Sequence, residues 1–172
     1  MVVDVQERLA AVMAYRDQVI ANIRRLIGVA RLLQLPIVVT EQYPSGLGPT
    51  VPELRELLAG ETFLEKSTFS CCGIEPFLAE LQRLQAQKLL VVGMETHVCV
   101  LQTVLDCLAA GYLVHVPNDA VCSRFTNDWR TGLARLAAAG ACVTTTETAL
   151  FELLERAGTD EFRAARTWIM AR

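Results

Sequence analysis

Short apolar runs rich in valine alternate along the chain with longer segments in which apolar residues recur every three or four positions. The short runs predict strands, and the longer segments predict amphipathic helices. The expected strands are Val2–Val5, Pro36–Thr40, Thr62–Glu65, Lys88–Gly93, Tyr112–Pro117 and Ala141–Thr144. The expected helices are Tyr15–Leu35, Pro52–Leu58, Ile74–Gln85, Thr96–Ala110, a segment capped by Thr126 or Asn127 that runs to Ala139, Thr146 to about Arg156, and a C-terminal helix after Gly158 and Thr159.

This alternation of strands and helices predicts an α/β protein. Lys88–Gly93 is apolar on both faces, as strands of buried parallel sheets are. We therefore expect a three-layer, Rossmann-like, doubly wound sheet of six mainly parallel strands with helices on both faces. Because no repeat, low-complexity tract or linker interrupts the pattern, residues 1–172 are expected to form a single domain.

Composition and charge exclude several classes of protein. Hydrophobic residues make up 52% of the chain and charged residues 20%, which excludes disorder. The net charge of −3 gives no footprint for nucleic acid and no polybasic membrane patch. The longest strongly apolar run, Leu89–Met94, is too short to span a bilayer. The start of the chain, MVVDVQERLA, lacks the features of a secretory signal. We expect a cytoplasmic protein with a small-molecule substrate and with neither nucleic acid nor membrane as a partner.

The mean hydropathy of +0.33 is high for a soluble monomer of this size and predicts a homo-oligomer. The C-terminal helix offers one candidate contact surface, because Phe162, Ala165, Trp168 and Ile169 form a single apolar stripe. The alternative is that this stripe packs on the helix's own domain.

The six cysteines, at positions 71, 72, 99, 107, 122 and 142, contain no CxxC pair. A disulfide scaffold is not expected in a cytoplasmic protein. A zinc knuckle is not expected either, because only His97 and His115 could supply imidazole ligands. Most of these cysteines are therefore expected to be buried free thiols. Cys71 and Cys72 are adjacent, and we expect them to be free as well.

Three residues of different chemistry follow three of the expected strands. They are Asp4, Lys66 and Cys99. Ligands of open α/β sheets bind beyond the carboxyl ends of the strands, so these residues define a candidate active site. Each also has an ordinary structural interpretation: Asp4 as a turn cap, Lys66 as a solvated side chain and Cys99 as a buried thiol. The position of Cys99 near a helix start favours a thiolate. The convergence of all three residues on one edge of the sheet favours a catalytic role.

Other side chains near this edge have weaker claims. Gln42, Tyr43 and Phe69 are candidates for substrate contact, with simple loop or core packing as the alternative. His97 precedes Cys99 by two residues, and residues at that spacing on a helix point to different faces, so a Cys–His dyad is not expected. Asp119 is expected to support the site rather than react.

The segments VVDVQERL, EKSTFS and VVGMETHVCVLQTVLDCLAAGY resemble the three signature segments of the isochorismatase-like cysteine hydrolases. That superfamily includes nicotinamidases and N-carbamoylsarcosine amidohydrolases. The block VTEQYPSGLGPTVPEL resembles the isochorismatase-domain hydrolases, and the likeness runs from Val2 to about Leu154. The resemblance implies a catalytic triad in which Cys99 attacks a carbonyl-type carbon, Asp4 carries the proton and Lys66 holds both groups in register.

The resemblance also implies a cis peptide bond between Met94 and Glu95, which would turn the Glu95 and Cys99 amides toward an oxyanion. One departure concerns metal. Nicotinamidases bind a metal through an Asp-x-His and a further His, whereas this chain reads TEQYPSG at that place. We therefore expect no metal and no other cofactor. Isochorismatases that cleave a vinyl ether lack the cysteine, so the presence of Cys99 argues against that reaction.

Three functional hypotheses follow from these residues. The first is a metal-independent cysteine hydrolase of a small amide-type substrate that works through a Cys99 thioester. The second is a non-catalytic binding protein that retains the fold. The third is a thiol redox protein that pairs Cys99 with Cys71 or Cys72, which requires the paired Cα atoms to lie within about 7 Å.

Overall fold

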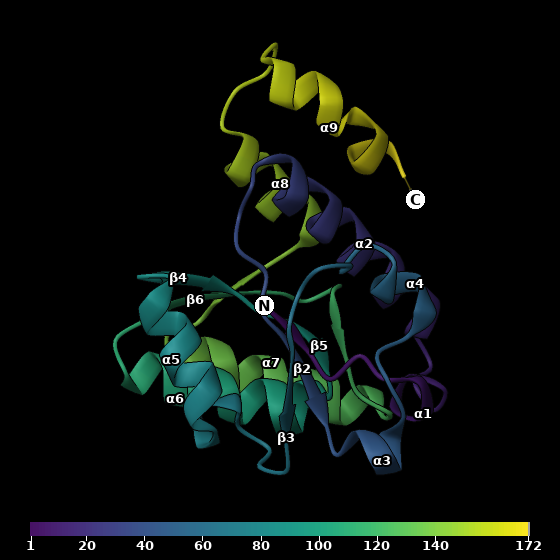
Figure 1. The fold of residues 1–172 in the computed structure, drawn as a ribbon, viewed down its shortest axis with the longest axis vertical. Helices are drawn as coiled ribbons and strands as arrows, with labels where there is room; N and C mark the ends of the chain where they lie inside the picture. Colours follow the sequence, from purple (N-terminus) through teal and green to yellow (C-terminus); the bar gives the residue numbers. More distant parts are fainter. Residues whose placement is uncertain (172) are drawn as a thin grey trace.

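The computed structural model describes residues 1–171 (Figure 1). The strands are β1 (Val2–Val3), β2 (Val39–Gln42), β3 (Phe63–Lys66), β4 (Lys88–Leu90), β5 (Val92–Met94), β6 (Leu113–Pro117), β7 (Val121–Cys122) and β8 (Cys142–Thr144). The α-helices are α1 (Glu7–Ala10), α2 (Arg16–Leu32), α3 (Pro44–Leu47), α4 (Pro52–Arg55), α5 (Glu75–Arg83), α6 (Leu101–Ala109), α7 (Thr126–Ala138), α8 (Thr146–Leu154) and α9 (Asp160–Met170). A 3-10 turn covers Cys71–Gly73 and a π-helical turn covers Thr96–Val100.

The strands form two parallel arrays that the chain connects directly. One array has the order β3-β2-β1-β5-β7 and the other has the order β4-β6-β8. Val91 separates β4 from β5, and residues 118–120 separate β6 from β7. The parallel α/β class is confirmed, but residues 1–171 contain eight strand segments where the sequence predicts six. The predicted strand Lys88–Gly93 is interrupted and supplies β4 to one array and β5 to the other, whereas β7 lies beyond the predicted strand Tyr112–Pro117 and was not predicted.

Alternate valines of the strands face opposite layers of helices. Val2, Val39 and Val92 pack in one core with α2, α4, α8 and α9. Val3, Val38 and Val91 pack in a second core with α5, α6 and α7. This alternation is the period of two expected of a strand that is buried on both faces. Figure 1 shows α5 and α6 on one side of β2 and β3 and α4 on the other side. The predicted three-layer arrangement is therefore confirmed.

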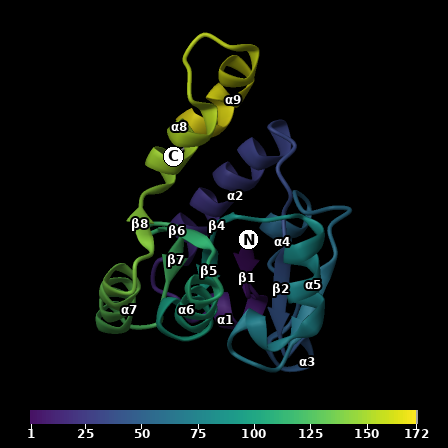
Figure 2. The same ribbon diagram turned by 90° about the vertical axis from the view of Figure 1, so that its left-hand side faces the viewer.

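The C-terminal helix packs on its own domain. Ala165 is fully buried, and Phe162, Trp168 and Ile169 lie against the same core as α2. Arg25 of α2 donates hydrogen bonds to the carbonyl oxygens of Trp168 (2.9 Å) and Ile169 (3.0 Å). Figures 1 and 2 show α8 and α9 together at the end of the molecule beyond the sheet. The apolar stripe is thus used within the chain, and it is not evidence for an oligomer.

A Gly28→Ala substitution should weaken the seating of α9 on α2. A Cβ atom at position 28 would lie 2.2 Å from Cε2 of Trp168, so the indole must move. Overpacking of this kind costs about 1–3 kcal/mol of unfolding free energy. We expect a lower thermal midpoint and faster proteolysis after Leu154, together with altered tryptophan fluorescence. If Gly28→Ala costs as much in a Trp168→Ala background as in the wild type, the contact is not the cause.

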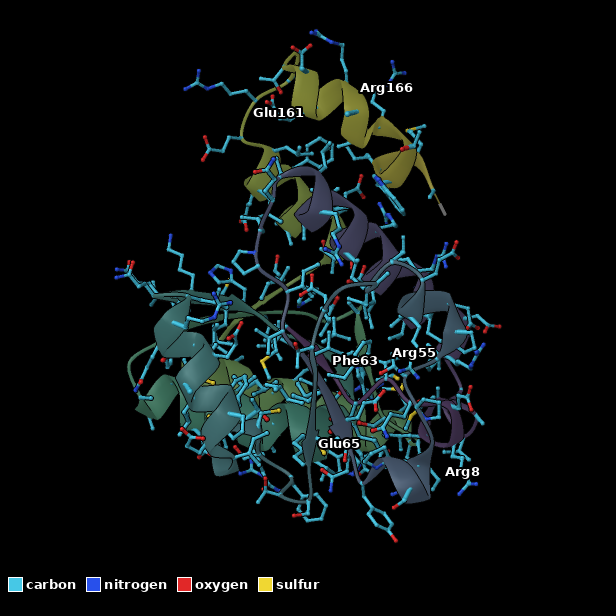
Figure 3. All side chains as sticks on the ribbon, viewed as in Figure 1. Arg8, Arg55, Phe63, Glu65, Glu161 and Arg166 are labelled. Atoms are coloured by element: carbon cyan, nitrogen blue, oxygen red, sulfur yellow. The ribbon has the colours of Figure 1, made fainter. Side chains whose placement is uncertain are left out.

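The free edge of β3 is partly covered by a side chain from α4. The guanidinium of Arg55 lies 5.0 Å from the centre of the Phe63 ring, and Figure 3 labels both residues where they meet. A cation over an aromatic face is a favourable contact, and a charged residue at an edge strand discourages pairing with other chains.

Within residues 1–171, none of the helices combines the length and the apolar character that crossing a membrane requires.

Candidate active site

Three strands of one array bring the predicted triad to one edge of the sheet. Asp4 directly follows β1, Lys66 is the last residue of β3, and Cys99 lies in the π-helical turn that follows β5. In the sheet, β1 is paired with β5 on one side and with β2 on the other, and β3 pairs with β2. Because all these pairings are parallel, the three residues leave the strands at the same edge.

Asp4 is held inside the protein by two donors. Its backbone has a φ of +53°, in the left-handed region, which ends β1 after Val3. The Asp4 side chain is fully buried; Oδ2 accepts a hydrogen bond from Nζ of Lys66 at 2.6 Å, and Oδ1 accepts one from Oγ1 of Thr40 at 2.7 Å. The carboxylate is thus used for an internal network, and it does not cap the turn into α1.

Lys66 is buried and its ammonium group is surrounded by acceptors. Besides the Asp4 carboxylate, Nζ contacts Oε1 of Gln42 at 2.7 Å and the carbonyl oxygens of Thr68 at 3.2 Å and Phe69 at 3.1 Å. A solvated lysine has no such fixed geometry. An ammonium group has three protons, so these neighbours fully occupy its donors and fix its position.

Gln42 lies beside Lys66 and links it to the neighbouring loop. Its side-chain oxygen accepts from Lys66, and its amide nitrogen donates to the carbonyl of Ser67 at 3.0 Å. Its backbone N–H donates to Oε1 of Gln6 at 2.7 Å, and the buried Gln6 side chain in turn donates to the carbonyls of Gln42 and Gly48. Gln42 therefore positions Lys66, and a contact with substrate remains a prediction.

Cys99 is a buried thiol with a proton acceptor beside it. Burial raises the pKa of Cys99 to about 12, and the negative charge of Asp4 and a hydrogen bond to that carboxylate act in the same direction. The ammonium of Lys66 lowers the pKa, but less strongly than these effects raise it. The raised pKa argues against the resting thiolate expected at a helix start. Asp4 is the group placed to receive the proton of the thiol.

The backbone before Cys99 has an unusual conformation. The peptide bond between Met94 and Glu95 is cis, at the position where the resemblance places it. Gly93 has a φ of +126°, and a Cβ atom there would lie 2.0 Å from the carbonyl oxygen of Val3, so only glycine lets β5 approach β1 this closely. The buried Glu95 carboxylate accepts from the backbone N–H (2.9 Å) and Nε (3.1 Å) of Arg124.

The side chains of the remaining candidates lie outside the hydrogen-bond network of Asp4 and Lys66. Tyr43 and Phe69 are 62% and 53% exposed, and their role as substrate contacts remains a prediction. Nδ1 of His97 lies 2.9 Å from Oγ of Ser123, which directs the ring to β7 and α7. Asp119 accepts from the backbone N–H and hydroxyl of Thr146 and so anchors the start of α8.

Sequence reasoning missed Thr40, Gln6 and Arg124. Thr40 ends the apolar run PIVVT, and a polar residue at that point is the one signal that marks it in the sequence. Among residues 1–171 there is no group of three or more His, Cys, Asp or Glu residues placed to hold a metal ion. Glu41, the acid nearest the position of the nicotinamidase ligands, accepts from the N–H and hydroxyl of Thr50.

The fold and this site can now be compared with known proteins. The model of the isochorismatase domain family matches residues 1–148, and the chain belongs to that family. Isochorismatase domain-containing protein 2A of Mus musculus is 41% identical over 162 residues, which cover 93% of this chain and 76% of the mouse protein. The human isochorismatase domain-containing protein 2 is 38% identical over 162 residues, with 93% and 77% covered.

Solved structures show the same relationship. The MAR1 ribonuclease of Caenorhabditis elegans superposes with a TM-score of 0.93 at 41% identity, covering 99% of this chain and 89% of that one. YcaC of Pseudomonas aeruginosa, solved with covalent acrylamide, superposes with a TM-score of 0.91 at 26% identity, covering 98% and 87%. The fold prediction and the family resemblance are both confirmed by these findings.

Proposed function

We propose that this protein is a cysteine hydrolase that cleaves a small amide-type C–N bond through a thioester on Cys99. The observation that carries the proposal is the fully buried ion pair of Asp4 and Lys66 beside the buried thiol of Cys99. Desolvating two charges is costly unless they are well paired, so such a pair next to a nucleophile needs a reason beyond stability. A general base for a protonated thiol is such a reason.

The first half of the reaction forms the thioester. The sulfur of Cys99 attacks the carbonyl carbon while Asp4 takes the thiol proton, so no free thiolate is needed. The carbonyl electrons move to oxygen, where the amides of Glu95 and Cys99 would stabilise the charge. When the tetrahedral intermediate collapses, the C–N bond breaks and Asp4 gives its proton to the leaving nitrogen.

The second half returns the enzyme to its starting state. Asp4 removes a proton from water, the water oxygen attacks the thioester carbon, and the C–S bond breaks as the thiol regains a proton. The product is the carboxylic acid. Throughout, Lys66 keeps the Asp4 carboxylate in place through its 2.6 Å contact, while Gln42 and the loop carbonyls keep Lys66 in place.

The charge of this chain supports a small substrate over a nucleic acid. A ribonuclease, as the Caenorhabditis elegans relative is called, must attract a polyanion, whereas this chain has a net charge of −3. The one cation of the triad, Lys66, is buried and paired.

The proposal is tested with a panel of small primary amides and carbamoyl compounds, with an RNA oligonucleotide as an additional substrate. We expect amine or ammonia release from at least one small amide, with an acyl adduct on Cys99 seen by mass spectrometry after rapid acid quenching. RNA cleavage without amide hydrolysis would contradict the proposal. If no substrate of either class turns over and no adduct forms, the non-catalytic hypothesis is favoured instead.

Activity should survive exhaustive chelation. Metal-binding relatives would need ligands near Glu41, and its carboxylate already accepts two hydrogen bonds from Thr50. The rate of amide hydrolysis should therefore be unchanged after dialysis against a chelator, with the metal content measured on the same sample. Restoration of a chelated, inactive enzyme by Zn²⁺ or Mn²⁺ would show that the mechanism is wrong.

Self-association of the chain also remains a prediction, to be measured by light scattering.

A further inference from the structure

The 3-10 turn Cys71–Gly73 is fastened to one face of α6. The backbone N–H of Cys71 donates to Oγ1 of Thr103 at 2.9 Å, and Oγ of Ser70 donates to Oδ2 of Asp106 at 2.5 Å. Ser70 also caps the turn by accepting from the backbone N–H of Cys72 at 3.2 Å. The two residues that precede Cys72 therefore fix the position of the turn against the helix.

This docking places Cys72 against Cys107 of α6. The two sulfur atoms are 3.6 Å apart although the residues are 35 positions apart in the chain. Cys72 is partly exposed, whereas Cys107 is fully buried. A disulfide bond is about 2.05 Å long, so a shift of about 1.5 Å would join the sulfurs. The redox hypothesis of the sequence analysis paired Cys99 with Cys71 or Cys72, whereas this contact defines a different pair.

The two thiols differ in the way that a reactive pair requires. The hydrogen bond from Cys107 lowers the pKa of Cys72, and Ser70 acts in the same direction, whereas the same contact with Cys72, together with burial, raises the pKa of Cys107. Burial also raises the pKa of Cys71 to about 11 and that of Cys122 to about 12. Cys72 thus combines thiolate character with access to solvent.

We propose that Cys72 and Cys107 are a redox-active pair, which a peroxide converts into an intramolecular disulfide. The sulfur of Cys72, as thiolate, attacks one oxygen of the peroxide; an S–O bond forms, the O–O bond breaks and hydroxide leaves. The sulfur of Cys107 then attacks Cys72; an S–S bond forms, the S–O bond breaks, and water leaves with the thiol proton. Two electrons pass from the sulfurs to the peroxide.

The disulfide would connect the segment that holds Lys66 to the helix that follows Cys99. The carbonyl oxygens of Thr68 and Phe69, which contact the ammonium of Lys66, lie in the same loop as Cys72. The pair does not depend on the proposed hydrolysis, because neither sulfur belongs to the triad. It can therefore be tested without a substrate.

The experiment treats the reduced, full-length protein with a few equivalents of hydrogen peroxide and maps the cysteines by mass spectrometry. We expect the wild-type protein to lose the mass of two hydrogen atoms and to yield a Cys72–Cys107 cross-linked peptide, both reversed by a reductant. Because the cross-link closes a long loop, the thermal midpoint of the oxidised protein should rise by at least a few degrees.

Three single variants separate the possible outcomes. In Cys107→Ser, Cys72 should stop at the sulfenic acid and be trapped by dimedone, and in Cys72→Ser neither product should form. Cys142→Ser removes the exposed cysteine and should behave as the wild type. If Cys107→Ser does not fold, Cys72→Ser and the wild-type peptide map still decide the matter. A cross-link involving Cys71 or Cys99, or oxidation of Cys72 with no disulfide, would overturn the proposal.

Discussion

Hydrolysis of the amide substrate should fall by at least about 10³-fold when Cys99 is replaced by alanine. The substitution removes the only atom that can form the thioester, and the Asp4–Lys66 pair keeps its mutual contact of 2.6 Å. The protein should remain folded, because the change removes one sulfur atom from a buried position. Steady-state kinetics with circular dichroism on the same preparation measures both properties.

The matched control is Cys142→Ala, which removes an exposed cysteine and should leave the rate unchanged. A double variant gives a second test, because groups that act as a unit have non-additive effects. Cys99→Ala combined with Asp4→Asn should be little worse than Cys99→Ala alone. Multiplying losses, or a Cys99→Ala enzyme that keeps most of its rate, would show that Cys99 is not the nucleophile.

The fold could be predicted because its signals are local. The predicted strands are themselves short apolar runs. The alternation of Val2 with Val3 and of Val38 with Val39 places successive side chains in opposite cores. The apolar stripe of the C-terminal helix is also visible in the sequence, but the surface on which it packs is not. Only the structure shows Trp168 over Gly28, so the sequence left self-association and intramolecular packing both open.

The interruption of the predicted strand Lys88–Gly93 was not predictable for a related reason. Leu89–Met94 reads as one continuous apolar run, and nothing in that run marks Val91 as the point where pairing changes partner. The change depends on neighbours: Val91 donates to the carbonyl of His115 on one side, and Val92 donates to that of Met1 on the other. Pairing of this kind is a property of three strands together.

The placement of the three candidate residues could be predicted, whereas their electrostatics could not. A residue type at a strand end is visible in the sequence, so Asp4, Lys66 and Cys99 were expected at one edge of the sheet. The protonation state of Cys99 depends on how deeply it is buried and on how two opposite charges balance around it. Both quantities come from elements distant in the chain. The same holds for Cys72, whose partner lies 35 residues away.

Asp4→Asn and Lys66→Met should change the reactivity of Cys99 in opposite directions while both abolish hydrolysis. The Asp4 carboxylate raises the pKa of Cys99 and the Lys66 ammonium lowers it. Asp4→Asn should therefore lower that pKa, by about 1–3 units for a nearby charge, and give faster alkylation by iodoacetamide at neutral pH. Lys66→Met should raise the pKa further and slow the alkylation.

The unfolding free energy of each variant separates a changed reactivity of Cys99 from a loss of folded protein. Lys66→Met leaves the buried Asp4 carboxylate without its cation, which costs about 3–5 kcal/mol of unfolding free energy. The double variant Asp4→Asn/Lys66→Met replaces both charges by neutral groups of similar size and should recover much of that loss. It should also bring the pKa of Cys99 closer to the value that burial alone sets, so its alkylation rate should lie between those of the two single variants.

The alkylation rates are measured as a function of pH by mass spectrometry, with Cys142 in the same molecule as the internal reference. The rate of hydrolysis shows whether Asp4 acts as a base or only as a nearby charge. In Asp4→Asn the thiol ionises more readily, yet the leaving nitrogen receives no proton, so a more reactive Cys99 accompanies a lost reaction. If Asp4→Asn slows alkylation, the carboxylate activates the thiol in the resting state by another route. If that variant keeps its hydrolytic rate, Asp4 does not carry the proton, and the triad assignment fails at its most specific point.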